Sequence, residues 1–301
     1  MNLKHNLIIA GIGVILLITI SLTLKWQLNI AFVRDNHPQL KSEEPIFSPS
    51  KPTVNPTLNP DDQNKPVAIN VPNEPFPIPK VSKFPVEGIP VLMFHSISTI
   101  PGNTLGVPVK QFTEEIEWLH QQNYHSLSLE EFYQALANKA LLPENPILIT
   151  FDDGYLDNYS VAWPILRRYG FRATFFVIMN SVGLGMMNWD QLNDLARQRN
   201  SLGSHTVHHY DLSTLSSKQQ KDELSLSKKG LENDLGINVQ ALCFPSGRYN
   251  KTTLELMPTL GYQLGFTTKT GKVHLGDDLL TLKRLRISGG MSLTSFKKQF
   301  P

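Results

Sequence analysis

One stretch, residues 147–155 (ILITFDDGY), constrains the fold more than any other part of the chain. Its uninterrupted apolar run, bounded by a glycine, is typical of a strand that is buried on both faces, as in a parallel sheet covered by helices. Asp152 and Asp153 follow directly, at the place where barrels of alternating strands and helices carry their chemistry. Two adjacent carboxylates repel each other, so the stretch predicts a positive group beside them.

Further strands and helices alternate through residues 86–301. Short apolar runs predict the other strands at 89–94, 173–178, 202–204, 239–244, 263–267 and 282–287. Apolar residues at helical spacing predict helices at 109–121, 129–142, 160–169, 189–199, 218–235, 251–260 and 293–300. The alternation favours an α/β fold with a parallel sheet, and the number of strands favours a distorted, incomplete (β/α) barrel of about seven strands.

The N-terminal part contains an apolar stretch at 7–24, roughly 18 residues long, which can just cross a hydrocarbon core of ~30 Å. The apolar region of a signal peptide is shorter, about 7–15 residues. We therefore expect an uncleaved transmembrane anchor at 7–26 after a cytoplasmic N-terminus at 1–6, with the rest of the chain outside the cytoplasm. A cleaved signal peptide, which would make the protein secreted, and a buried core helix are the alternatives.

Residues 27–85 form the next segment, and prolines recur every few positions from about residue 36 onward, with polar residues between them. Such a composition contains too little apolar surface for a core and predicts an extended spacer. The spacer would hold the folded domain, 86–301, away from the membrane.

Charge and cysteine content exclude some function classes. With 301 residues and a formal net charge of +2, the chain offers no electrostatic case for binding nucleic acid. Cys243 is the single cysteine, so an intrachain disulfide and a thiolate metal cluster are both excluded. Oligomeric state is left open.

Two histidines, His205 and His209, lie four residues apart in SHTVHHYD, directly after a predicted strand. Imidazoles at this spacing can converge on one ion, and one carboxylate of the Asp152–Asp153 pair would complete a three-ligand site with open positions. The other carboxylate would remain a base beside the ion. Zinc is the first expectation, although cobalt, nickel or iron also suit these donors. A solvated polar loop is the alternative explanation of the histidines alone.

Three motifs, TFDDGY, SHTVHH and CFPSGRYN, resemble the first three motifs of the polysaccharide deacetylases, the NodB-homology domains or carbohydrate esterase family 4. The resemblance extends from about residue 89 to the C-terminus. It implies a distorted (β/α) barrel of about seven strands and a metal-assisted hydrolysis of N-acetyl, sometimes O-acetyl, groups.

Matching motif positions carry the family's roles to this chain. The resemblance implies that Asp152 is the catalytic base and that the metal ligands are Asp153, His205 and His209. It also implies that Thr206 braces the histidine loop. The third motif would supply an oxyanion-binding backbone N–H, here that of Ser246. Four residues are expected to bind substrate: Tyr155, Pro245, Ser246 and Arg284.

Departures from the family pattern leave two roles open. Cys243 stands where the third motif commonly begins with an arginine that orients the base, and Arg284 or Arg286 could reach in from the last strand instead. The fourth motif is not evident and the late catalytic histidine is missing, since His274 lies in a polar setting typical of a surface loop. His95, after the first strand, resembles an early histidine of the branch that deacetylates poly-β-1,6-N-acetylglucosamine. That likeness suggests a general acid, and a capping histidine that packs the first loop is the alternative.

Three functional hypotheses follow. The first is a membrane-anchored, metal-dependent hydrolase that removes N-acetyl groups from an extracellular amino-sugar polymer similar to poly-β-1,6-N-acetylglucosamine. The second keeps the chemistry and changes the substrate to peptidoglycan, a chitin-like chain or acetylated xylan. The third is a non-catalytic carbohydrate-binding protein on the same barrel, which the complete set of two aspartates and two histidines disfavours.

Overall fold

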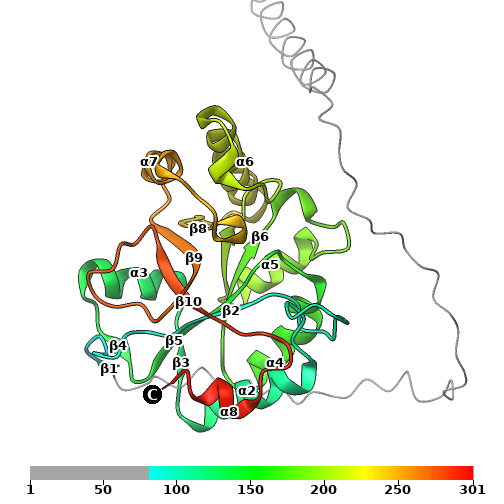
Figure 1. The fold of residues 1–301 in the computed structure, drawn as a ribbon, viewed down its shortest axis with the longest axis vertical. Coiled ribbons are helices and arrows are strands. Elements are labelled where there is room, and N and C mark those ends of the chain that lie inside the picture. The colour runs from blue at the N-terminus through cyan, green and yellow to red at the C-terminus, as the bar shows by residue number, and fades with distance from the viewer. Residues whose placement is uncertain (1–80, 301) are drawn as a thin grey trace, which may run out of the picture. The chain divides into compact units, whose positions relative to one another are not determined.

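The computed structural model describes residues 81–300, in which seven parallel strands form a closed ring with helices around its outside (Figure 1). In ring order the strands are β2 (Val91–Phe94), β5 (Pro146–Phe151), β6 (Thr174–Val177), β7 (Ser201–Ser204), β8 (Ala241–Cys243), β9 (Leu264–Thr270) and β10 (Leu282–Arg286). Strand β2 is hydrogen-bonded to both β5 and β10, which closes the ring.

The ring is irregular. Strands β7 and β8 share one pair of backbone partners, Ser204 and Leu242, and the register shifts between β9 and β10. A short strand, β3 (His125–Ser126), pairs with β5 outside the ring. The predicted seven-stranded barrel is therefore confirmed, and its expected incompleteness is limited to having seven strands instead of the eight of a regular barrel.

Helices follow most of the strands, as predicted. Their bounds are α2 (Val109–Gln121), α3 (Leu129–Asn138), α4 (Trp163–Arg168), α5 (Trp189–Arg197), α6 (Ser217–Leu235), α7 (Lys251–Thr259) and α8 (Leu293–Lys297). A π-helical turn, Asn158–Ala162, precedes α4. Four helices begin with a capping box, in which the side chain before the helix and the third helical residue satisfy each other's backbone N–H groups: α3, α5, α6 and α7.

Two predicted boundaries are wrong. The helix predicted at 129–142 ends at Asn138, because Lys139 adopts a left-handed conformation with φ 55°. The chain then enters β4 (Leu142–Pro143), which pairs antiparallel with β1 (Val81–Ser82). Residues 81–82 thus belong to the folded domain instead of the predicted spacer 27–85.

The predicted anchor at 7–26 and most of the predicted spacer lie outside the described residues. Within residues 81–300, no helix combines the length and the apolar composition that a membrane span requires.

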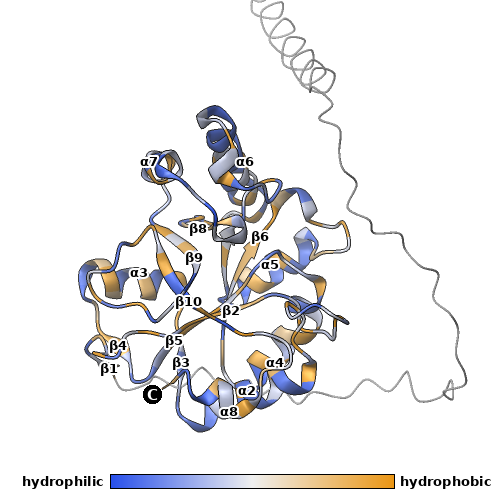
Figure 2. Ribbon diagram, viewed as in Figure 1, coloured by the Kyte–Doolittle hydropathy of each residue, from blue (hydrophilic) through white to orange (hydrophobic). Residues whose placement is uncertain are grey.

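Alternate side chains of the strands serve two different cores. Phe151 stacks on Phe94 and Phe175 of the neighbouring strands, with ring centroids 5.4 and 5.1 Å apart, in the core between ring and helices. Phe176 and Phe266, from strands that are not neighbours in the ring, meet across its interior at 5.2 Å. Figure 2 shows strands such as β5 and β6 largely in apolar colours and outer helices such as α6 in polar ones. Burial on both faces explains the uninterrupted apolar run of β5.

Candidate active site

The candidate catalytic residues gather at the carboxyl ends of the ring strands. His95 follows β2, Asp152 and Asp153 follow β5, and His205 follows β7. Because all ring strands are parallel, these ends lie on one rim, and loops far apart in sequence meet there. The structure thus brings together the Asp-Asp-His-His set that the sequence predicts, with His209 joining from the loop after β7.

Asp153, His205 and His209 form a group of donors that fits a divalent ion. Their ligand atoms all lie within 4.8 Å of one another, and Asp153 Oδ1 is 3.3 Å from His205 Nε2 and 3.5 Å from His209 Nε2. His205 Nδ1–H donates to the backbone carbonyl of Cys243 at 2.8 Å. This bond fixes the ring and directs Nε2 at the site, as ligating histidines require. Three protein donors leave open positions, the arrangement of catalytic zinc sites.

The charge of the site changes the proton affinity of His205. Burial would lower the pKa of His205, but the neighbouring Cys243, the hydrogen bond to Asp153 and the nearby charge of Asp152 hold that pKa well above its usual range. An ion that binds these donors therefore displaces a proton, so its affinity should increase with pH.

The metal-binding loops contain residues in the left-handed backbone region. Asp153, Thr206 and His209 have φ values of 72°, 66° and 60°. Such conformations cost of order 1–3 kcal/mol each for non-glycine residues and cluster at functional sites. Thr206 Oγ1 accepts a hydrogen bond from the backbone N–H of His209 at 3.0 Å, which is the brace expected of this threonine.

Asp152 is held by Arg284, which resolves the choice between Arg284 and Arg286. The Arg284 guanidinium binds both oxygens of Asp152, each at 2.7 Å, whereas Arg286 is exposed. Its remaining donors reach the Thr267 carbonyl at 3.0 Å, Thr150 Oγ1 at 3.1 Å and Cys243 Sγ at 3.2 Å. All five N–H groups are used and the side chain is fully buried. The predicted substrate-binding role of Arg284 does not fit this geometry, because no donor is left for a substrate.

The Asp152–Arg284 pair sets the charge state of the predicted base. Burial alone would raise the pKa of Asp152, but the charge and hydrogen bonds of Arg284 outweigh it and hold the pKa well below its usual range. Asp152 is therefore ionised at neutral pH.

His95 lies across from this carboxylate, with Nε2 3.9 Å from Asp152 Oδ2. Burial lowers the pKa of His95, although Asp152 opposes the effect. The Asn158 side-chain amide donates to the His95 backbone carbonyl at 2.7 Å. That bond anchors the backbone of the loop, and the imidazole faces Asp152.

The remaining substrate-binding candidates differ in accessibility. Tyr155 is half-buried, and burial together with Asp153 raises its pKa to about 12, so it stays a neutral phenol. Ser246 is exposed on a tight turn with φ 52°, while Pro245 before it is buried and shapes the turn instead of offering a surface to substrate. His274 lies exposed in a loop, as expected.

Comparison with known proteins decides the family. A model of the polysaccharide deacetylase family matches residues 139–265. A protein of Bacillus subtilis (strain 168), YxkH, assigned to the polysaccharide deacetylases, is 39% identical over 209 residues, which cover 69% of this chain and 74% of the relative. The chain belongs to the polysaccharide deacetylase family. It is accordingly a hydrolase of the kind that acts on amide bonds of acetylated polysaccharides.

Other relatives of this deacetylase agree in sequence and fold. The poly-β-1,6-N-acetyl-D-glucosamine N-deacetylase of Staphylococcus epidermidis is 27% identical over 206 residues, covering 63% of this chain and 70% of the relative. The solved structure of the Streptococcus pyogenes deacetylase PplD in complex with acetate matches with a TM-score of 0.67 at 34% identity, covering 71% of this chain and 98% of PplD. The structure of IcaB from Ammonifex degensii matches with a TM-score of 0.62 at 25% identity, covering 70% of this chain and 95% of IcaB.

One residue of the deacetylase site was missed by the sequence analysis. Glu223 of α6 is buried, and its Oε2 accepts the backbone N–H groups of Val207 and His208 at 3.0 and 2.9 Å. Its Oε1 binds His208 Nδ1 at 2.6 Å. Glu223 thus holds the loop between the two histidine ligands. An acidic residue beside Leu224 on the buried stripe of a helix is the signal that could have identified it.

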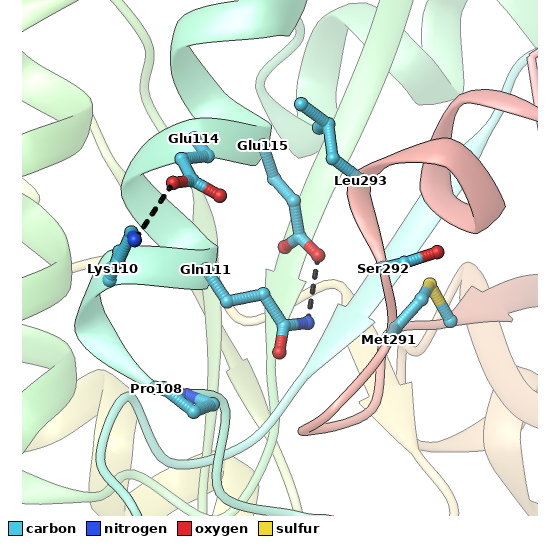
Figure 3. Close-up of a pocket in the computed structure, with 8 residues that line it drawn as sticks. All are labelled: Pro108, Lys110, Gln111, Glu114, Glu115, Met291, Ser292 and Leu293. Carbon is cyan, nitrogen blue, oxygen red and sulfur yellow. Dashed lines mark hydrogen bonds and ion pairs between the residues drawn. The ribbon is translucent and has the colours of Figure 1, made fainter.

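A surface cavity of about 300 Å³ lies apart from these residues, between the start of α2 and the segment before α8 (Figure 3). None of the catalytic candidates lines it. Glu115 on its wall is fully buried, with Oε1 bound to the Gln111 amide at 2.8 Å and Oε2 without a partner. Burial raises the pKa of Glu115 to about 8.

Proposed function

We propose that this deacetylase removes N-acetyl groups from an extracellular amino-sugar polymer similar to poly-β-1,6-N-acetylglucosamine. The observation that carries the proposal is His95, which faces Asp152 from the end of β2 beside the Asp153–His205–His209 group. The Staphylococcus epidermidis relative, named for this activity, supports the substrate class.

The donor group is suited to a divalent ion, with zinc as the first candidate and cobalt, nickel or iron as others. An ion held by Asp153, His205 and His209 would polarise the acyl oxygen and lower the pKa of a water molecule. Family deacetylases are metal-dependent, which supports this assignment.

The protein's own groups then divide the proton transfers. Asp152, kept ionised and oriented by Arg284, accepts the proton of the attacking water. The backbone N–H of Ser246, on its exposed turn, would donate to the oxyanion of the tetrahedral intermediate. His95, in its protonated form, gives a proton to the departing amine, so that the products are acetate and a free amino sugar. The proton that Asp152 has taken up can then return to His95, which lies 3.9 Å away.

Acetate release from a panel of polymers tests the function. We expect release from β-1,6-linked N-acetylglucosamine oligomers, loss of release after chelation and recovery when zinc is restored. Faster release from β-1,4-linked chitin-like or peptidoglycan chains, or from acetylated xylan, would show that this polymer, and not the β-1,6-linked one, is the preferred substrate. Binding of a polymer without any acetate release would indicate a non-catalytic carbohydrate-binding protein, and release that survives thorough chelation would contradict the metal site.

His95 is tested by the substitution His95→Asn. General acid catalysis contributes about 10²–10⁴-fold, so turnover should fall by that order while zinc content stays unchanged. Zinc content is measured by elemental analysis of the purified variant. Near-normal turnover would assign the proton donor to another group.

We also propose that residues 7–26 anchor the protein in a membrane, with the deacetylase domain outside the cytoplasm. The support is the length of the apolar stretch at 7–24 and the proline-rich segment that follows it. Cell fractionation should find the full chain in the membrane and a chain lacking residues 1–26 in the soluble fraction. If cells that express the full chain instead release a shorter protein into the medium, the N-terminal segment is cleaved.

A further inference from the structure

An exposed aromatic ring lies next to the metal-binding loop and has no role in the chemistry above. Tyr210 directly follows the ligand candidate His209, and its side chain is 53% exposed. Among residues 81–300, it is the one aromatic member of the exposed large apolar side chains. Its position directly after a metal-ligand candidate makes this exposed ring a candidate contact for substrate.

The Tyr210 ring is held from behind. It stacks on the ring of His208 with centroids 5.1 Å apart and planes 16° from parallel. His208 is fixed in turn by its hydrogen bond of 2.6 Å to Glu223, a buried acid of α6. One face of Tyr210 is therefore occupied by a fixed neighbour, and the exposed remainder is preorganised for a flat partner.

The neighbours of Tyr210 in the chain connect the metal loop with the turn of Ser246. Asp211, the next residue, pairs with Arg248 at 3.5 Å. Arg248 follows the turn of Ser246, whose backbone N–H is the candidate oxyanion donor. Tyr210 thus lies in the chain between His209, a metal-ligand candidate, and Asp211, which contacts the segment after the Ser246 turn.

We propose that Tyr210 is the stacking platform for a sugar ring next to the one being deacetylated, and that His208 and Glu223 are positioning residues for it. The proposal rests on the proposed polysaccharide function and names a determinant of chain-length preference within it. Aromatic side chains suit this task because they offer a large apolar face at a low cost in conformational entropy.

Acetate release from β-1,6-linked N-acetylglucosamine oligomers of one to five units tests the platform. For the wild type, kcat/KM should rise with length once the second subsite is filled. Tyr210→Ala should lower kcat/KM for the pentamer about tenfold more than for the monomer, the order of one aromatic contact. Tyr210→Phe should retain the preference because the ring remains, and His208→Ala should weaken it because the platform loses its support.

Leu226→Ala provides the matched control, since Leu226 is 54% exposed on α6 and has no place in the site. It should leave the length preference unchanged, and zinc content should be equal in all variants. Equal length dependence in the wild type and Tyr210→Ala would overturn the platform alone. Failure of the wild type to release acetate from any of these oligomers would contradict the proposed substrate, and the platform with it.

Discussion

Two fully packed carboxyl groups of this molecule show opposite proton affinities. Asp152, at the rim of the ring, is 2% exposed and is bound by both ends of the Arg284 fork. Glu115, on α2, is 0% exposed and has one neutral amide partner. The pKa of Asp152 lies well below its usual range, whereas that of Glu115 is raised to about 8. Burial removes water from both, so the partner decides which form persists.

This difference separates a catalytic group from a structural one. A base must be ionised when substrate arrives, and the buried Arg284 cation, with all its donors satisfied, is the main group that keeps Asp152 charged. Glu115 borders the cavity of Figure 3 and has no cation to compensate its charge, since Lys110 there pairs with Glu114 at 3.9 Å. Buried Glu223 accepts three hydrogen bonds, from the backbone N–H groups of Val207 and His208 and from the His208 ring.

Breaking the Asp152–Arg284 pair should have the largest effect. Arg284→Met leaves Asp152 buried without its partner and should lower the free energy of unfolding by about 3–5 kcal/mol. Acetate release should also fall by about 100-fold or more, because the base is protonated or displaced. Urea unfolding of the zinc-loaded protein and an acetate assay measure the two losses.

The double variant Asp152→Asn/Arg284→Met separates charge from packing. It should recover most of the lost stability, because neither charge is then left alone, and it should remain inactive. Additive losses from the two single variants would show that the residues do not act as a pair.

Removing the Glu223 carboxylate should have the next largest effect. Glu223→Leu frees the loop between His205 and His209, and zinc affinity should fall by about 10–100-fold, the usual cost of losing the support of a metal ligand. Glu223→Gln keeps the size of the side chain and one acceptor oxygen, so its zinc affinity should lie between those of the wild type and Glu223→Leu. Competition with a chromogenic chelator measures the affinity.

Gln220→Leu is the control for Glu223, since Gln220 lies on the same helix but accepts a hydrogen bond from Thr253 of α7. It should reduce stability without changing zinc affinity. Unchanged affinity in Glu223→Leu would show that the loop keeps its shape without the carboxylate.

Neutralising Glu115 should have the smallest effect. Unlike the substitutions above, it should raise the free energy of unfolding. The folded protein keeps the Glu115 proton up to about pH 8, whereas the unfolded chain loses it near pH 4.5. Between these values the folded state binds more protons, so this group makes stability fall as pH rises. Glu115→Gln should remove that slope, giving a gain of about 1–3 kcal/mol at pH 8 and none at pH 4.5.

Urea unfolding at several pH values between 4.5 and 8 measures the slope. Glu114→Gln is the matched control, because Glu114 borders the same cavity but is half-exposed and ion-paired, and its variant should run parallel to the wild type. If Glu115→Gln keeps the wild-type slope of stability against pH, a group other than Glu115 causes that slope.

Local patterns were sufficient to predict most of the fold. The seven strands of the ring and the helices α2 to α8 could be predicted, because burial on two faces and helical periodicity leave marks within a few neighbouring residues. The two-residue strands β3 and β4 were not predicted. The errors fall where other forces decide. Lys139 ends a helix in a left-handed conformation, and Val81–Ser82 is a strand because Leu142–Pro143 lies beside it.

The active-site residues also fall into two groups, those that local patterns predict and those that only the fold identifies. Asp152, Asp153, His205 and His209 could be predicted because each pair lies in one short motif after a strand. The orienting arginine could only be narrowed to two residues. Arg284 and Asp152 are 132 positions apart and meet because β2 joins β5 to β10 across the closure of the ring.

The sequence by itself determined which side chains stand at the strand ends and which chemistry they can perform, since residue type and local spacing decide both. The tertiary structure alone decided the environment of those side chains. It showed that Arg284 and Cys243 together surround the base, that Glu223 supports the histidine loop, and that Asp152 is ionised where Glu115 holds its proton. Such properties depend on partners from distant segments and on the exclusion of water, and neither exists until the ring closes.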